Sequence, residues 1–89
     1  MPLNPATLWH IYLLECTDGS FYAGIATDVE RRFAEHLCGK GARYTRSHKP
    51  LRLLASRPVG SRAQALQAEI AIKRLPKGKK LAALLAGHG

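Results

Sequence analysis

Near the start of the chain, apolar and polar residues alternate in a way that predicts a β-hairpin. Two runs of aromatic and aliphatic residues, 9–16 and 20–25, flank a turn at Asp18-Gly19. An Asp-Gly step supplies the positive φ angles that a tight turn requires. The first strand is a candidate for an exposed sheet edge. Because side chains alternate across a strand, its two faces are expected to be His10, Tyr12 and Leu14 on one side and Trp9, Ile11 and Leu13 on the other.

The next segment predicts a helix that begins near Asp28. Thr27 and Glu30 have the spacing of a capping box, in which Thr27 caps the backbone amides and Glu30 reaches back. Arg32 and His36 are four residues apart, so both are expected to project from one edge of the helix toward the hairpin. The apolar residues that recur every four positions, and that should form the buried stripe, are Val29, Phe33 and Leu37.

The middle of the chain predicts a loop followed by a third strand. Residues 40–49 are polar, basic and rich in small side chains, which is typical of a loop. Residues 51–59 form a β-like stretch that is bounded by Pro50 and Pro58. Its expected core residues are Leu51, Leu53 and Ala55.

The end of the chain predicts two helices. Ser61 and Gln64 form a second capping box, which opens an Ala-rich helix. Pro76 is expected to end this helix, and residues 77–86 predict a short last one. The side chains expected to share one side of the first of these helices are Leu66, Ile70 and Lys73.

The order of these elements is strand, strand, helix, strand, helix, helix. It predicts an α+β fold in which a three-stranded antiparallel sheet is flanked by helices. A chain of 89 residues has room for one such domain, so we expect a single domain over residues 1–89 with its core at about 8–86.

Charge is distributed very unevenly along the chain. The 14 Lys+Arg and 6 Asp+Glu residues give a formal net charge of +8. Residues 1–39 contain two basic and five acidic side chains, whereas residues 40–89 contain twelve basic ones and a single acid, Glu69. A basic half of this kind predicts a polyanionic partner, with nucleic acid favoured over an anionic membrane.

Several classes of protein are excluded by what the sequence lacks. No apolar run approaches the roughly 20 residues that span a bilayer, and the first residues do not have the pattern of a signal peptide. Cys16 and Cys38 are too few and too far apart for a disulfide scaffold, a C-x-x-C motif or a structural zinc site, so both are expected to be small core residues. We therefore expect a cytoplasmic protein without membrane contact.

Five polar side chains are candidates for chemistry: Tyr12, Tyr22, Arg32, His36 and Glu69. Each also has an ordinary structural explanation. Tyrosines on strands usually pack with a solvated hydroxyl. Arg32 could pair with Glu35 or Asp28, His36 could be an exposed helix residue, and Glu69 could be the partner of Lys73 one turn later.

Taken together, these residues resemble the GIY-YIG endonuclease superfamily. The tripeptides His10-Ile11-Tyr12 and Tyr22-Ala23-Gly24 flank a hairpin and are followed by Arg32, His36 and Glu69 at fitting positions. His10 replaces the name-giving Gly, and Ala23 replaces Ile. The resemblance extends from about Trp9 to Leu85 and is strongest to the small stand-alone bacterial members, which share phrases such as residues 16–20, 28–32 and 39–45.

The resemblance implies that water attacks a phosphodiester with the help of one divalent metal ion, Mg²⁺ above all, with Mn²⁺ as the alternative. Glu69 would hold the metal, and Arg32 would stabilise the charge of the transition state. Tyr12 would be the general base, with its phenolate favoured by Arg32 and the metal, while His36 would orient it or share its role. Tyr22 would bind the phosphate or the water. Gly24 would keep the backbone clear for the substrate.

The remaining basic residues are predicted to contact phosphates without reading sequence. Their alternative is a merely solvated basic face. Tyr44, among them, could stack on an exposed base or simply pack. The predicted nucleic-acid-binding residues are Lys40, Arg43, Tyr44, Arg46, Lys49, Lys73, Arg74, Lys77, Lys79 and Lys80.

We therefore expect a metal-dependent DNA endonuclease that acts on structured or damaged DNA with little sequence specificity. Two alternatives remain at this point. One is a non-catalytic module that kept the fold and binds DNA or RNA. The other is an adaptor that delivers the domain to DNA-repair proteins through its C-terminal helix.

Overall fold

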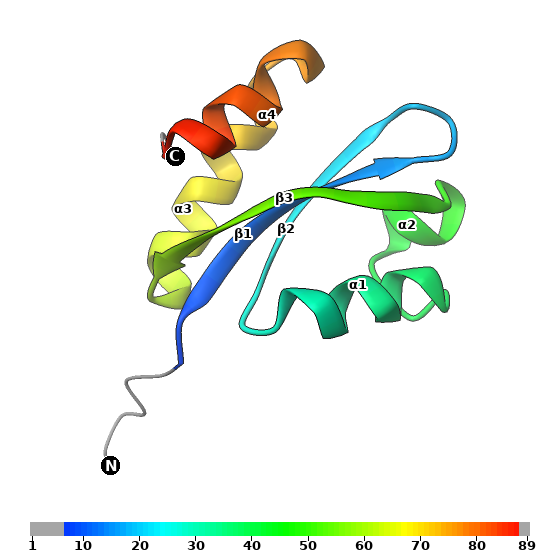
Figure 1. Cartoon of the computed structure of the whole chain (residues 1–89), viewed down its shortest axis with the longest axis horizontal. Helices are drawn as coiled ribbons and strands as arrows, with labels where there is room; N and C mark the ends of the chain where they lie inside the picture. The colour runs from blue at the N-terminus through cyan, green and yellow to red at the C-terminus, as the bar shows by residue number, and fades with distance from the viewer. Residues whose placement is uncertain (1–6, 88–89) are drawn as a thin grey trace.

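The computed structural model describes residues 7–87 of the chain, as three strands and four helices (Figure 1). In chain order these are β1 (Trp9–Cys16), β2 (Phe21–Ala26), α1 (Val29–Leu37), α2 (Arg43–Ser47), β3 (Pro50–Gly60), α3 (Arg62–Lys73) and α4 (Lys77–Ala86). The expected order is confirmed, with one short helix, α2, added between α1 and β3.

The three strands form one antiparallel sheet in the order β2-β1-β3. Gly19 has φ +85 in the turn between β1 and β2, as the Asp-Gly step predicts. The Asp18 carboxylate accepts hydrogen bonds from the amide and hydroxyl of Ser20 and fixes this turn. In the order β2-β1-β3 the central strand is β1, because β3 pairs along its other side. The expectation that β1 lies at an exposed edge is therefore wrong.

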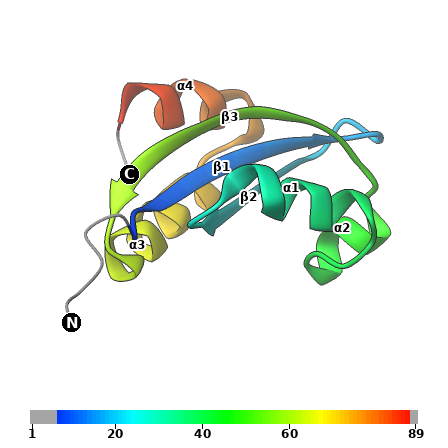
Figure 2. The ribbon, with the colours of Figure 1, turned by 60° about the horizontal axis from the view of Figure 1, so that its bottom comes forward.

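Helices cover both faces of this sheet (Figures 1 and 2). On one face, Ile11 and Leu13 of β1 are fully buried against Ile72 of α3 and Leu84 of α4. On the other face lie α1 and α2. There Tyr12, Leu14 and Ala26 form a second buried cluster with Val29 and Phe33 packed against it. The predicted division of β1 into two faces is confirmed.

The N-cap of the first helix lies one residue later than predicted. Asp28, and not Thr27, is the N-cap residue, and its carboxylate accepts a hydrogen bond from the amide of Arg31. The predicted stripe fails at its last member, because Leu37 is 48% exposed while His36 is buried. The side of α1 that faces the sheet therefore buries His36, where the apolar periodicity predicts Leu37.

Residues 40–49 are not only a loop, because α2 occupies their centre. Thr45 is the buried residue of this short helix, and its hydroxyl donates to the carbonyl of Ala42. Polar, basic and small residues hide such a helix from a periodicity argument, because five residues span little more than one turn.

The third strand is longer than predicted and passes through Pro58. Pro58 lies opposite His10 inside β3, and the ladder between β1 and β3 contains several register shifts. Leu51 is 54% exposed, so it does not belong to the core, whereas Leu53 and Ala55 do pack against the two clusters. β3 is an edge strand, which is where a proline is tolerated.

The capping box of α3 is confirmed, since Ser61 and Gln64 exchange both side-chain to backbone hydrogen bonds. Pro76 ends the helical segment as expected and serves as the N-cap of α4. Leu66, Ile70 and Lys73 share one side of α3 by their spacing, but it is not the side that packs on the sheet. Ile70 is 51% exposed, and the residues of α3 that are buried are Ala65, Ala68 and Ile72.

The two cysteines differ in their environment. Cys16 is buried in β1, as predicted, and Cys38 is exposed after α1, so the expectation that both are core residues holds only for Cys16. Within residues 7–87, no helix combines the length and the apolar character that crossing a membrane requires.

Candidate active site

The hairpin and α1 bring the two tyrosines of the motif together with His36. Tyr12 pairs with Gly24 and Leu14 pairs with Tyr22 across the hairpin, so both tyrosines project from the same face of the sheet. Their ring centroids are 6.4 Å apart, and the His36 ring lies 5.9 Å from Tyr12 and 5.3 Å from Tyr22. The sequence-predicted cluster of Tyr12, Tyr22 and His36 is therefore present.

A continuous chain of hydrogen bonds runs from Tyr12 through His36 to α2. The Tyr12 hydroxyl lies 2.8 Å from His36 Nε2, and His36 Nδ1 lies 2.6 Å from Thr45 Oγ1. Thr45 Oγ1 donates its own proton to the carbonyl of Ala42, at 3.0 Å. Tyr12, His36 and Thr45 are each no more than 2% exposed, so these hydrogen bonds form between buried side chains.

The chain of hydrogen bonds assigns the protons. A hydroxyl carries a single proton, and Thr45 gives its proton to Ala42, so Thr45 must accept from Nδ1–H of His36. The neutral ring then has a free electron pair at Nε2, which accepts the proton of the Tyr12 hydroxyl. His36 is thereby held as the Nδ1–H tautomer, with Tyr12 as donor.

Two glycines make room for this arrangement. A Cβ atom at Gly24 would overlap the Tyr12 hydroxyl, and a Cβ atom at Gly41 would overlap Nδ1 of His36. Gly24 was expected to clear the backbone for a substrate. The atoms that need this space in the structure belong to Tyr12, and Gly41 plays the matching part for His36.

Burial sets the protonation of both rings. Burial raises the pKa of Tyr12 to about 12, helped by the neighbouring Tyr22 and opposed by the positive charge of Arg32. Arg32 does favour the Tyr12 phenolate, as predicted, but desolvation outweighs the arginine, so the pKa of Tyr12 in the free protein is raised and not lowered. Burial, together with Arg32, lowers the pKa of His36, while Glu35 opposes this shift. At neutral pH Tyr12 is a phenol and His36 is a neutral base.

Arg32 lies at the rim of the cluster and not at its centre. Its guanidinium donates to Glu35 at 3.0 Å, and 34% of its side chain is exposed. Glu35 also pairs with Arg31 at 3.8 Å. Arg32 thus pairs with Glu35, as its structural explanation predicts. It is also close enough to act electrostatically on Tyr12 and His36.

Glu69 and Lys73 reach the site from α3, which packs beside β2. Lys73 Nζ lies 3.3 Å from the Glu69 carboxylate and 5.7 Å from the centre of the Tyr22 ring. The charge of Glu69 is felt at Tyr12 and Tyr22, where it raises both pKa values, although burial is the larger cause. Glu69 is therefore part of the site, and its predicted pairing with Lys73 is also present.

The donor set suits Mg²⁺ better than a metal that needs a protein cage. Residues 7–87 contain no group of three or more His, Cys, Asp or Glu side chains that could hold a metal. Mg²⁺ is commonly bound through one or two carboxylates, with water and substrate phosphates as the other ligands. Glu69 is such a carboxylate, since its side chain lies beside the two tyrosines and is still 17% exposed.

The predicted DNA-binding residues are spread over two regions. In and around α2, the side chains of Lys40, Arg43, Arg46 and Lys49 are all exposed. Tyr44, also exposed, stacks with Tyr22 at 5.7 Å and with His48 at 4.0 Å, so its ring already has two aromatic neighbours. This favours packing over base stacking for Tyr44.

The second region is the corner between α3 and α4. The exposed residues there are Lys73, Arg74, Lys77 and Lys79. Lys77 lies 4.8 Å from the Phe21 ring, and Lys80 donates to the carbonyls of Ile72 and Lys73. Lys80 therefore helps to end α3 and already uses two of its three donors there, so it is less available to a phosphate than the exposed lysines. Its place in the first turn of α4 is explained by these carbonyls.

His10 does not join the cluster. It lines a separate hollow with Asp28, Glu30 and Ser56, and its Nδ1 atom is buried without a hydrogen-bond partner among the described residues. The two residues that the sequence analysis missed are Thr45 and Gly41. Both stand in the segment taken as a loop, and the only available signal was the phrase at residues 39–45.

Comparison with known proteins agrees with this geometry. The family model of the GIY-YIG catalytic domain matches residues 8–82, so the chain belongs to the GIY-YIG family. A UPF0213 protein of Xanthomonas axonopodis pv. citri is 59% identical over 78 residues, covering 88% of this chain and 76% of the relative. A UPF0213 protein of Cupriavidus necator is 60% identical over 80 residues, covering 90% and 87%.

Two solved structures have the same fold. The solution NMR structure of a UPF0213 protein from Bacillus halodurans has a TM-score of 0.54 and 41% sequence identity, covering 92% of this chain and 87% of the other. That of a protein from E. faecalis has a TM-score of 0.61 and 37% identity, covering 91% and 86%. The family and the α+β architecture predicted from sequence are thus confirmed.

Proposed function

We propose that this protein is a metal-dependent endonuclease that hydrolyses phosphodiester bonds in DNA. The observation that carries the proposal is the buried chain from Tyr12 to Thr45, with Arg32 and Glu69 beside it. A binding module needs no ordered proton acceptor behind a buried tyrosine. A hydrolase that must deprotonate water does.

In the proposed reaction, Tyr12 and His36 act in sequence as one base. The Tyr12 oxygen accepts a proton from the attacking water while its own proton passes to Nε2 of His36, 2.8 Å away. The water oxygen then bonds to phosphorus as the bond to the leaving oxygen breaks. This relay avoids a free phenolate, which the pKa of about 12 makes rare at neutral pH.

His36 becomes an imidazolium in this step, and its Nδ1–H continues to donate to Thr45. Arg32 stabilises the negative charge that develops on the phosphate oxygens, since its guanidinium is always charged and can donate two parallel hydrogen bonds. To do so it shares or leaves Glu35, at 3.0 Å. The Tyr22 hydroxyl, on the same face, contacts the phosphate.

We further propose Mg²⁺ as the cofactor, held by Glu69, with Mn²⁺ as a substitute. The ion would supply Lewis-acid stabilisation of the phosphate and leaving oxygen. Glu69 would exchange its contact with Lys73, at 3.3 Å, for the ion. Lys73 would then be released toward the DNA backbone.

The basic half of the chain supports DNA as the substrate. The exposed cations around α2 and at the corner of α3 and α4 can contact phosphates without reading bases. We therefore propose little sequence specificity and a preference for structured or damaged DNA. A DNA-repair partner that directs the domain remains a prediction.

A nuclease panel tests the proposal. Flap, branched, single-stranded and blunt duplex DNA are incubated with the protein and Mg²⁺, Mn²⁺ or EDTA. We expect metal-dependent cleavage of at least one structured substrate. The absence of cleavage on every substrate, with binding retained, would identify a non-catalytic binding module instead.

Glu69→Gln sharpens the test of the metal site. This variant should lose cleavage by about a hundredfold or more and keep or increase DNA affinity, because one negative charge is removed. Glu30→Gln on α1 removes the same charge at an exposed position away from Glu69 and should cleave normally. Full Mg²⁺-dependent cleavage by Glu69→Gln would overturn the metal assignment.

A further inference from the structure

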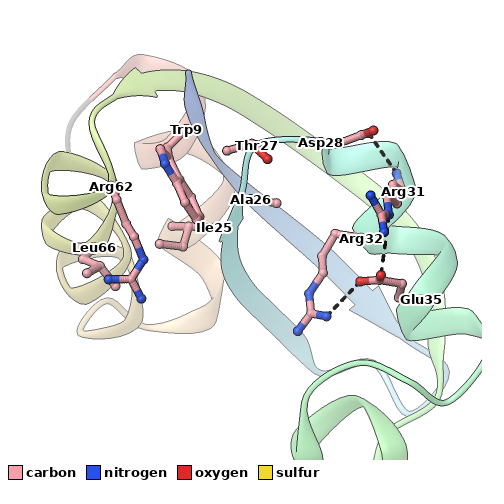
Figure 3. Close-up of a pocket in the computed structure, with 10 residues that line it drawn as sticks. All are labelled: Trp9, Ile25, Ala26, Thr27, Asp28, Arg31, Arg32, Glu35, Arg62 and Leu66. Carbon is pink, nitrogen blue, oxygen red and sulfur yellow. Dashed lines mark hydrogen bonds and ion pairs between the residues drawn. The ribbon is translucent and has the colours of Figure 1, made fainter. Parts of the chain in front are cut away.

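A groove of about 430 Å³ extends from Arg32 to the start of α3 (Figure 3). One end is formed by Arg31, Arg32 and Glu35 of α1. The other end is formed by Trp9, Ile25, Arg62 and Leu66, from β1, β2 and α3. The groove therefore starts at the proposed phosphate-binding arginine and leads away from it to an aromatic and apolar end.

The aromatic end pairs a tryptophan with an arginine. The guanidinium carbon of Arg62 lies 5.7 Å from the centre of the Trp9 ring. Among residues 7–87, no acidic side chain pairs with Arg62, whereas Arg31 and Arg32 both pair with Glu35. Arg62 is exposed, so its charge is available to a ligand.

The chemistry of this end matches a nucleobase. Bases stack on aromatic side chains and on guanidinium planes, and every base offers such a face. Ile25 and Leu66 provide apolar surface beside the pair, as a flat and weakly polar ring requires. A groove of this volume is in the range that holds a small ligand such as one nucleotide.

We propose that this groove binds one unpaired nucleotide next to the phosphate that is cleaved. The base of this nucleotide lies against Trp9 and Arg62, and the DNA backbone that joins it to the cleaved phosphate passes Arg32. A base inside a duplex has both faces covered by neighbouring base pairs, so it cannot stack there. The inference rests on the proposed nuclease function and specifies its substrate class: DNA with an unpaired nucleotide at the cut, such as a flap, gap or bulge.

Trp9 is the only tryptophan of the chain, so its fluorescence reports on this groove alone. The experiment titrates the intact protein, in EDTA to prevent cleavage, with a single-stranded oligonucleotide, a flapped duplex and a blunt duplex of the same sequence. Binding is followed separately by the anisotropy of a dye on the DNA. We expect the single strand and the flap to quench Trp9 fluorescence, and the blunt duplex to bind without quenching.

Arg62→Gln and Arg52→Gln form a matched pair of variants. Both remove one positive charge from an exposed arginine, but Arg52 lies on β3 beside Glu15 and does not line the groove. Arg62→Gln should weaken single-strand binding roughly fivefold or more relative to Arg52→Gln, because it removes a stacking partner as well as a charge. Both variants should bind blunt duplex equally.

Bound single-stranded DNA that leaves Trp9 fluorescence unchanged would overturn the groove proposal, and so would equal single-strand affinities of the two variants. Cleavage of structured DNA with Mg²⁺ in that case would leave the nuclease proposal intact. The opposite result, quenching and the affinity difference without cleavage of any substrate, would support the groove and overturn the nuclease proposal.

Discussion

The two faces of the sheet bury different kinds of side chain. The face under α3 and α4 is apolar, with Ile11, Leu13, Ile72 and Leu84 all fully buried. The face under α1 and α2 buries a tyrosine, a histidine and a threonine, joined by hydrogen bonds of 2.8 and 2.6 Å. Polar groups inside a protein cost free energy unless they are paired, so the second face is built around its partners.

This difference separates stability from chemistry within a small domain. A chain of 89 residues has little surface to bury, and the apolar face supplies much of its core. Burying the polar groups of the other face costs free energy, and their hydrogen-bonded proton arrangement serves the proposed chemistry. Variants on the two faces should therefore fail in different ways.

The largest effect is expected from Tyr12→Phe, which removes the hydroxyl but keeps the ring. Cleavage should fall by about a hundredfold to ten-thousandfold, because water loses its proton acceptor. The free energy of unfolding should fall by only about 1–3 kcal/mol, since the Nε2 atom of His36 is left unpaired. Single-turnover cleavage and urea unfolding measure the two quantities. Wild-type cleavage per folded molecule of Tyr12→Phe, whatever its stability, would contradict the role of Tyr12.

The opposite pattern is expected from Leu84→Ala on the apolar face. The Leu84 side chain is fully buried, at 0% exposure, in the apolar cluster between the sheet and helices α3 and α4. Its truncation should lower the free energy of unfolding by about 2–5 kcal/mol through lost burial and the cavity left behind. Cleavage per folded molecule should stay at the wild-type level. A loss of cleavage in a well-folded variant would show that the two faces are not separable.

A smaller effect is expected from Thr45→Val, a positioning change on the polar face. Valine keeps the shape but offers no acceptor to Nδ1–H of His36, so the ring is no longer held in one tautomer. Cleavage should fall about tenfold, in the range by which partners of a catalytic or metal-binding histidine commonly act. Thr45→Ser should restore most of it, because serine keeps the hydroxyl. Equal activity of the Val and Ser variants would argue against this positioning role.

The smallest effect is a pH dependence. Burial and Arg32 lower the pKa of His36, so the neutral ring persists below its usual value of 6.5. Cleavage should stay level near pH 7 and decline only as the pH falls below 6.5. Stability should decline over the same interval, since the unfolded chain takes up the proton near 6.5 and the folded one does so at lower pH. A rate that falls already between pH 8 and 7 would contradict a neutral His36 as proton acceptor.

Sequence reasoning predicted the hairpin, the two faces of β1 and the α+β order, because each depends on local signals. Asp18-Gly19 marks the turn, and the alternation from Trp9 to Cys16 marks the faces. The motif also indicated which side chains gather at the site. These features are dictated by residues that are neighbours in sequence or share a known pattern.

The sequence did not predict what depends on long-range packing. His36 is buried where periodicity favours Leu37, because α1 is held over a polar neighbour, Thr45. α2 is too short for a periodic pattern to be visible. The raised pKa of Tyr12 likewise follows from burial by the whole fold, which outweighs the nearby Arg32.

The central claim is that the polar face holds His36 as the neutral Nδ1–H tautomer, ready to accept the proton of Tyr12. Nitrogen-15 NMR of the imidazole ring at pH 7 tests this most directly, since protonated and unprotonated ring nitrogens have distinct chemical shifts. We expect a proton on Nδ1 and none on Nε2. A proton on Nε2, whether in the other tautomer or in an imidazolium, would contradict it.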